Sequence, residues 1–317
     1  MSEFKIKKIP LKKVNYKRSF FQKHGFLRGI DIIRRFALYN LLYKPTHIKK
    51  WIKINEYNLP LDYKDSLISK GLYIMKSREI LETEIIKHNL KKEDVCLDAG
   101  ANIGYYVFLE AKITNSTIYA FEPDPRNIKL LKKGIIKNGF KNIEVFEKAI
   151  SNKLGKERLY LSNQTNVSSM VKHEDFNGKI VEVETETIDN FCKNKKIDFI
   201  RMDVEGFEYE IFQGMENLIK SKKPLKIMVE FHSNKYSKKR NFPKRLEELK
   251  RNGFICKHVV TQEKPLIKIM EKLGYAPKII VNDSPNLRAM YSNIKIEDVA
   301  YLIGKGNFLR AGFFERK

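Results

Sequence analysis

From about Lys91 onwards, short apolar runs alternate with helical patterns, and this alternation restricts the fold more than any other feature of the chain. The runs that we expect to be strands are 95–98, 117–121, 143–146, 197–202, 225–231, 254–260 and 308–315. The clearest helical patterns lie at 104–111, 126–138, 208–220 and 242–252. Strands that alternate with helices in this way form parallel β-α-β units. The sequence therefore predicts an α/β fold built on a largely parallel sheet.

Two stretches depart from this alternation. Residues 151–186 contain shorter alternating runs, which predict a β-hairpin excursion. Residues 262–307 contain helical pieces and a turn near 282–285 before the last apolar run. Because loops of this length are uncommon inside a compact domain, we expect an insertion before the last strand.

The first expected strand ends in an acid and leads directly into a loop with two glycines, Asp98-Ala-Gly100-Ala-Asn102-Ile-Gly104. Glycines allow the backbone to approach a ligand closely, and the start of the following helix offers unpaired N–H groups. The second strand ends at Glu122, 24 residues after Asp98, where a carboxylate can bind the two hydroxyls of a ribose. These features predict a site for an adenosine-containing cofactor.

The chemistry of this loop distinguishes between such cofactors. Asn102 stands where a dinucleotide site has its second glycine, which normally makes room for a pyrophosphate. Asp98 would repel phosphates but could bind an ammonium group. S-adenosylmethionine has a ribose, an ammonium group and no phosphate, so we expect this cofactor and disfavour a nucleotide-dependent oxidoreductase.

Acids and a histidine follow the fourth and fifth expected strands. Asp203 and Glu205 come after the fourth strand, and Glu230 and His232 end the fifth. Open α/β sheets place their sites at the carboxyl ends of strands, so these four side chains should meet in one pocket. Each of them alone could cap a helix or lie on the surface, but the group of four indicates a functional role.

Several of these motifs occur together in the order and spacing of one known family. They are LDAGANIGYY (97–106), AFEPDP (120–125), AIS (149–151), TID (187–189), DFIRMDVEGFE (198–208), QG (213–214) and the segment 224–232. Over about 95–232 the chain therefore resembles the FkbM family of S-adenosylmethionine-dependent methyltransferases, with Arg201 in place of a lysine common among members. The resemblance implies a class I methyltransferase, with a Rossmann-like, seven-stranded, mostly parallel sheet and helices on both faces.

The resemblance also implies O-methylation, often of sugars or polyketide-like natural products, so we expect a hydroxyl-bearing small molecule or glycan as acceptor. A hydroxyl is a poor nucleophile near neutral pH, and a base or a metal must assist it. We expect His232 to be the base, because an unperturbed histidine pKa of about 6.5 suits this task. Glu230 would orient His232 or contact the acceptor.

The other acids have several interpretations. Asp203 and Glu205 could bind acceptor hydroxyls, flank the methionine end of the cofactor, or hold Mg²⁺ together with Glu230. No residue is assigned as a metal ligand. The residues expected to bind the cofactor are Asp98, Gly100, Asn102, Gly104, Glu122, Ala149, Ser151 and Asp203. Residues 168–170 and His173, in the hairpin excursion, belong either to the substrate side of the site or to a surface loop.

The formal net charge of +24 lies entirely at the two ends of the chain. Residues 1–53 contain 15 basic and 2 acidic residues, residues 233–317 contain 19 and 8, and the residues between contain 28 of each. Within 18–43, apolar residues recur at helical spacing. This segment is either a helix on an anionic membrane or, in the interpretation we prefer, a helix that packs on the catalytic domain.

A rival hypothesis assigns the basic ends to nucleic acid, in an RNA-modifying methyltransferase or an RNA-binding protein. We disfavour it, because no RNA-binding motif occurs and the fourth strand is not followed by an Asn/Asp-Pro-Pro-aromatic turn. The three widely spaced cysteines and the lack of a signal-peptide pattern predict a cytoplasmic protein, soluble or peripherally attached to a membrane. We expect a basic, partly helical extension at 1–60 and a methyltransferase domain at 61–317, with its motif core at 95–232 and its insertion at about 262–307.

Overall fold

The computed structural model of this chain describes residues 26–46, 51–61, 68–162, 168–172, 176, 178–264, 266–283 and 286–317. The α-helices are α2 (Phe26–Leu38), α3 (Lys44–Thr46), α4 (Ile68–Met75), α5 (Ile80–Asn89), α6 (Tyr105–Ile113), α7 (Pro125–Asn138), α8 (Ile188–Phe191), α9 (Glu208–Gln213), α10 (Glu216–Lys220), α11 (Phe242–Arg251), α12 (Ile267–Lys272) and α13 (Ile296–Lys305). The strands are β1 (Trp51–Ile54), β2 (Tyr57–Pro60), β3 (Cys96–Ala99), β4 (Ile118–Phe121), β5 (Ile143–Phe146), β6 (Ala149–Ile150), β7 (Gly155–Leu161), β8 (Lys179–Glu186), β9 (Phe199–Met202), β10 (Leu225–Glu230), β11 (Ile255–Thr261), β12 (Ile279–Asp283), β13 (Asn286–Ile294) and β14 (Leu309–Arg316).

Over the described residues, the main sheet has nine strands in the order β12-β13-β11-β14-β10-β9-β3-β4-β5. Neighbours from β5 to β10 pair in parallel, whereas β14 lies antiparallel to both β10 and β11. The seven strands predicted from the sequence are all present. Numbered in chain order, they lie as 3-2-1-4-5-7-6 across the sheet, with only the last strand reversed.

The insertion differs from the prediction, because it contributes two strands to the sheet in addition to the helices α12 and α13. Its strands β12 and β13 form a hairpin that pairs with β11 and widens the sheet from seven strands to nine. The expected turn lies between them, although Ser284 and Pro285 are outside the described residues. Since β13 pairs with a strand about 30 residues earlier, local sequence periodicity does not reveal this pairing.

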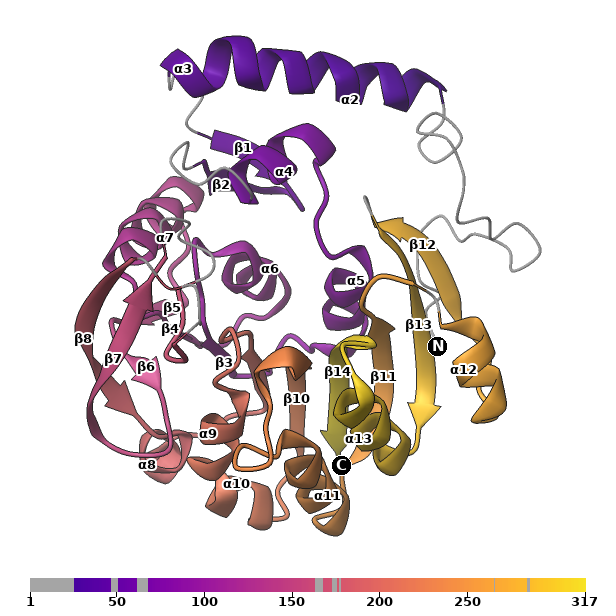
Figure 1. The fold of residues 1–317 in the computed structure, drawn as a ribbon. Coiled ribbons are helices and arrows are strands. Elements are labelled where there is room, and N and C mark those ends of the chain that lie inside the picture. The colour runs from indigo at the N-terminus through magenta and orange to yellow at the C-terminus, as the bar shows by residue number, and fades with distance from the viewer. Residues whose placement is uncertain are drawn as a thin grey trace.

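Helices cover both faces of the sheet, as predicted (Figure 1). Successive strand residues point to opposite faces, so Cys96 belongs to one hydrophobic core and Leu97 to the other. The first core includes Phe108 of α6 and Leu131 of α7, and the second includes Leu246 of α11. The predicted hairpin excursion is also present, as the small sheet β6-β8-β7.

The residues before the first motif form two structures. The hairpin β1–β2 packs against the body of the protein, where the Tyr57 hydroxyl donates to the Tyr105 carbonyl over 2.5 Å. The helix α2 buries only Gly29 and Ile32, while apolar residues of the predicted stripe, including Ile30 and Ile33, are exposed. The helix α2 thus contacts α4 and contributes Ile32 to the core, as in our preferred interpretation, but most of the predicted apolar stripe does not take part in this packing.

Candidate active site

The glycine loop after β3 packs directly on the chain that follows β9. Gly100 has a φ of +88°, and a Cβ at this position would lie 2.0 Å from the carbonyl oxygen of Asp203. Only glycine fits such a close approach in this conformation. The contact joins the predicted cofactor loop to the acids that follow the fourth strand of the core.

A buried arginine connects two of the predicted site residues. Asp98 and Arg201 are register partners on β3 and β9, and an Arg201 Nη atom lies 3.0 Å from Asp98 Oδ1. The other Nη atom lies 3.0 Å from Asp203 Oδ2, and the guanidinium lies 3.9 Å from the centre of the Tyr106 ring. Burial raises the pKa of Asp98, whereas Arg201 acts in the opposite direction. Asp98 is fully buried and already paired with a cation, which disfavours its expected role of binding the cofactor's ammonium directly.

A cavity of about 60 Å³ opens at the carboxyl ends of β3, β4 and β9. Five of the eight predicted cofactor residues line it, namely Gly100, Asn102, Glu122, Ala149 and Asp203. Asp98, Gly104 and Ser151 do not line it; a Cβ on Gly104 would overlap the Phe108 ring, so this glycine serves packing. Residues 168–170 also line the cavity, which brings the hairpin excursion to the site. His173 lies outside the described residues.

Glu122 is held in place by the backbone around it. Its carboxylate accepts the N–H of Asn102 over 2.7 Å and the N–H of Asp124 over 2.8 Å. Burial raises the pKa of Glu122 to about 7, although these two hydrogen bonds act to lower it. The carboxyl group is thus fixed in direction and lies on the cavity wall.

A second cavity, of about 30 Å³, shares Gly100, Asn102 and Asp203 with the first. Its far wall carries Arg78 and Glu79, whose side chains lie 2.6 Å apart. Burial acts to raise the pKa of Glu79, but Arg78 and Arg310 hold it well below its usual range. The sequence analysis did not identify these two residues, which precede the recognised motifs.

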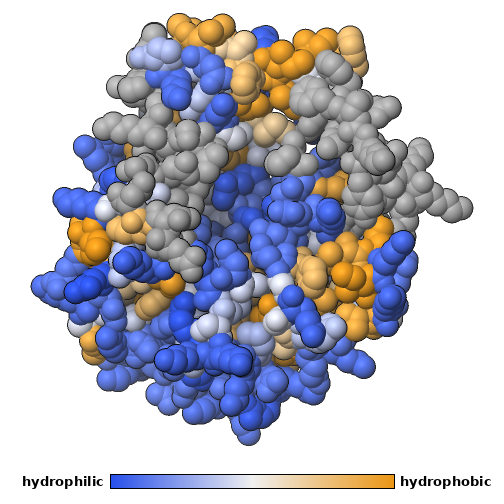
Figure 2. Space-filling model, in the orientation of Figure 1, coloured by the Kyte–Doolittle hydropathy of each residue, from blue (hydrophilic) through white to orange (hydrophobic). Residues whose placement is uncertain are grey.

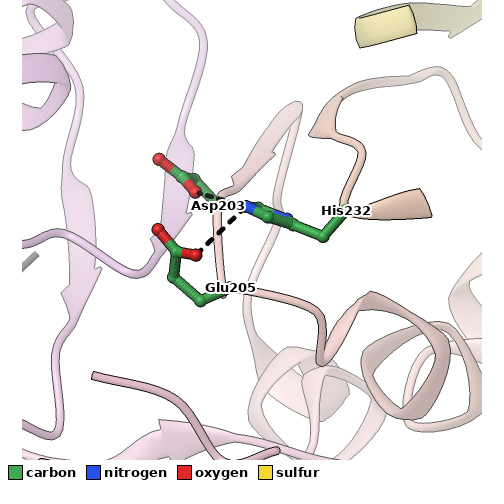
Figure 3. Close-up of side chains that lie close together, drawn as sticks. All are labelled: Asp203, Glu205 and His232. Atoms are coloured by element: carbon green, nitrogen blue, oxygen red, sulfur yellow. Dashed lines mark ion pairs between the residues drawn. The ribbon is translucent and has the colours of Figure 1, made fainter. Parts of the chain in front are cut away.

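Figure 3 shows Asp203 and Glu205 directed toward the ring of His232. His232 Nε2 lies 3.4 Å from a Glu205 carboxylate oxygen and 3.9 Å from an Asp203 oxygen. On the other side of the ring, Nδ1 lies 2.6 Å from Oε1 of the buried Glu208. Burial alone would lower the pKa of His232, but Glu208, Glu205 and Glu230 outweigh it and raise this pKa to about 10. The expected pKa of about 6.5 is therefore wrong, and His232 carries a proton at neutral pH.

Glu230 does not orient His232 as expected. Its carboxylate lies 2.9 Å from an Nη atom of Arg310, and Glu208 is the acid that holds the imidazole. Burial raises the pKa of Glu230 to about 8, against the effect of Arg310. Glu208 had appeared in the motif 198–208, but nothing in the sequence distinguished it from a helix-capping acid.

Glu205, like Asp203, lines the larger cavity together with Glu122. Its side chain is 27% exposed, so a ligand can reach it. Burial raises the pKa of Glu205 to about 7, although the neighbouring His232 acts to lower it. A carboxylate with this pKa is available to accept a proton near neutral pH.

Asp203, Glu205 and His232 also form a group that could hold a metal ion, since one ligand atom from each lies within 4.8 Å of the others. The set differs from the expected one, which contained Glu230 instead of His232. Mg²⁺ prefers oxygen ligands, and His232 would have to lose its proton to coordinate any metal. The imidazolium itself supplies a positive charge to these acids, so the donor set does not fit Mg²⁺ well.

Comparison with known proteins identifies the family. Residues 98–256, half of the chain, match the family described as "Methyltransferase FkbM domain". The chain belongs to the FkbM methyltransferase family. The resemblance seen in the motifs is thereby confirmed, and the strand order 3-2-1-4-5-7-6 agrees with the class I fold that it implied. Within this FkbM chain, the hairpin β12–β13 is an addition to the seven-stranded core.

Two curated relatives match parts of this FkbM protein. "Methyltransferase 1" of Beauveria bassiana is 22% identical over 144 residues, which are 38% of this chain and 58% of the relative. "tRNA wybutosine-synthesizing protein 2" of Schizosaccharomyces pombe is 27% identical over 113 residues, 33% of this chain and 26% of the relative. The chain thus spans just over half the length of the first relative and about a quarter of the second.

Solved structures show only distant likeness. An rRNA methylase from Streptococcus thermophilus is 12% identical, with a TM-score of 0.38 and coverage of 70% of this chain and 99% of that one. TYW2 of M. jannaschii, in complex with AdoMet, is 17% identical, with a TM-score of 0.35 and coverage of 77% and 86%. TM-scores this low assign no function.

Proposed function

We propose that this protein transfers the methyl group of S-adenosylmethionine to a hydroxyl of a sugar, glycan or related metabolite. The observation that carries the proposal is the position of Glu205, which faces both the cavity lined by Glu122 and the protonated His232. A cofactor with its ribose at Glu122 would bring its methyl group toward Glu205. Family membership supports methyl transfer as the reaction class.

The two adjoining cavities fit the two ends of this cofactor. Glu122 would bind the ribose hydroxyls, and Ala149 with Ile150 would line the adenine. The methionine end would extend past Asp203 into the second cavity. There, Arg78 would bind the α-carboxylate, since its positive charge is complementary to this group, whereas Glu79 is buried and already paired with Arg78 and Arg310.

In the reaction, the acceptor oxygen forms a bond to the methyl carbon as the sulfur–methyl bond breaks, and the acceptor's proton passes to Glu205. The cofactor supplies the driving force, and the protein supplies alignment and proton removal. His232 is a positioning residue in this scheme, because its positive charge favours the ionised form of Glu205. Glu205 thus replaces His232 as the proposed base.

Replacing Glu122 with Ala should weaken S-adenosylmethionine binding by about 10- to 100-fold, because a charged group that makes two hydrogen bonds to the ribose is lost. Isothermal titration calorimetry measures this change. The matched control is Glu147→Ala, at an acid that is 56% exposed and outside the cavity. Unchanged affinity in a folded Glu122→Ala protein would remove Glu122 from the ribose site.

Chelation should leave the activity within about twofold of its starting value, because the imidazolium of His232 already provides a cation for Asp203 and Glu205. The measurement compares methyl transfer in EDTA with transfer in added Mg²⁺. Loss of activity in EDTA that Mg²⁺ restores would instead support a divalent cation in this cluster.

The second candidate is an RNA-modifying methyltransferase. It is favoured by the basic ends of the chain and by one relative named for tRNA wybutosine synthesis. A single labelling experiment separates the two candidates. Radiolabelled S-adenosylmethionine is incubated with the protein and with glycan, lipid-linked sugar or RNA pools. Label in RNA alone would support the RNA-modifying candidate and contradict the proposed sugar, glycan or metabolite acceptor.

A further inference from the structure

The helix α2 exposes an apolar face that nothing in the described structure covers. Leu27 is 82% exposed, Ile33 51% and Ile30 46%, and Leu41 in the turn that follows is 80% exposed. In the same helix, Gly29 and Ile32 are buried, and α2 contacts α4. Figure 2 shows hydrophobic surface at the end of the molecule where α2 lies in Figure 1. A contiguous apolar surface of this kind is typical of an interaction site.

In the described part of the chain, no helix is both long and apolar enough to cross a bilayer. Residues 26–46 are helical throughout, although the turn 39–43 is a π-helix. At 1.5 Å per residue this unit is about 30 Å long. Helices with one apolar face and basic flanking residues lie in the plane of a membrane surface.

Charge distinguishes between the partners that could cover this face. Residues 1–53, which include α2, carry 15 basic and 2 acidic residues. A second copy of the chain would bring two such segments together, and their like charges would repel. An anionic bilayer offers an apolar interior for the leucines and negative headgroups for the lysines and arginines.

We propose that the apolar face of α2, together with the basic charge of residues 1–53, binds this protein to the surface of an anionic lipid bilayer. Within this arrangement, Arg34, which is 69% exposed and pairs with Asp31 over 2.9 Å, would contact headgroups. The inference does not depend on the proposed methyl transfer, since binding is measured without cofactor or acceptor.

The test is co-sedimentation of the full chain with two kinds of vesicle. One contains phosphatidylcholine alone, and the other contains about 30% phosphatidylglycerol in addition, which gives its surface a negative potential. We expect strong binding to the anionic vesicles only, and weaker binding as NaCl rises, because salt screens the headgroups. The double variant Leu27→Glu/Leu41→Glu should lower the partition coefficient at least tenfold. The control is Ile136→Glu on α7, at an apolar residue that is also 80% exposed and lies outside α2.

Three results would overturn the proposal. The first is equal binding to both vesicle compositions, or none to either. The second is vesicle binding that is unchanged in Leu27→Glu/Leu41→Glu, because the basic residues alone would then account for the binding. The third is a dimer, seen by sedimentation velocity, that the same double variant dissociates, because the face would then belong to a second copy of the chain. Circular dichroism confirms that each variant is folded.

Discussion

Exchanging Glu205 for Gln is expected to lower kcat by about 10²- to 10⁴-fold, the usual contribution of a general base. Glutamine keeps the shape of the side chain but cannot accept the acceptor's proton. In the unmodified enzyme, kcat/KM should rise tenfold per pH unit below about pH 7 and level off above it, because Glu205 is protonated below its pKa of about 7. Steady-state kinetics from pH 5.5 to 10.5 test both expectations, with the exposed Glu247→Gln of α11 as control.

The same profile separates Glu205 from His232 as the base. If neutral His232 accepted the proton, the rate would continue to rise up to the pKa of that histidine, about 10. His232→Gln removes the charge that lowers the pKa of Glu205. We therefore expect the midpoint of its profile to lie above pH 7, with most of the activity recovered near pH 9. A folded His232→Gln protein that is inactive at every pH would contradict Glu205 as base.

The sequence predicted the strands of the core because its signals there are local. Each buried strand is a short apolar run, and the acids at 98, 122, 203 and 230 mark strand ends. The added hairpin β12–β13 was missed, since its place in the sheet depends on pairing with the distant β11.

The charge states of the site could not be predicted, because they depend on contacts between elements far apart in the chain. His232 acquires its raised pKa from Glu208 and Glu205, which reach it from the segment after β9. Arg201 was noted only as a departure from the family, although an arginine inside a buried strand implies an acidic partner. That partner is Asp98 on the neighbouring strand. The size and direction of these shifts depend on the balance between burial and charged neighbours, which sequence patterns do not quantify.

Arg310 illustrates the same limit, and its removal should have the largest effect on stability. Its guanidinium lies 2.6 Å from Glu79, 2.9 Å from Glu230 and 3.0 Å from Glu82, and the side chain is only 11% exposed. Arg310→Met keeps most of the apolar stem but leaves three buried acids without their shared cation. Breaking a buried ion pair from one side typically costs about 3–5 kcal/mol, so we expect a loss of that size in the free energy of unfolding.

Urea denaturation of the full chain measures this loss, with Lys220→Met as the control. Lys220 is 65% exposed and pairs with Glu216 over 3.4 Å, and such surface pairs contribute about 0–1 kcal/mol. The double variant Arg310→Met/Glu82→Met should recover part of the loss, because it also removes one of the buried carboxylates that Arg310→Met leaves without its cation. If Arg310→Met costs less than about 1 kcal/mol, the three acids must take up protons or water when the arginine is absent. In that case Arg310 would fix the position of Glu230 beside the site and contribute little to stability, and the double variant would show no recovery.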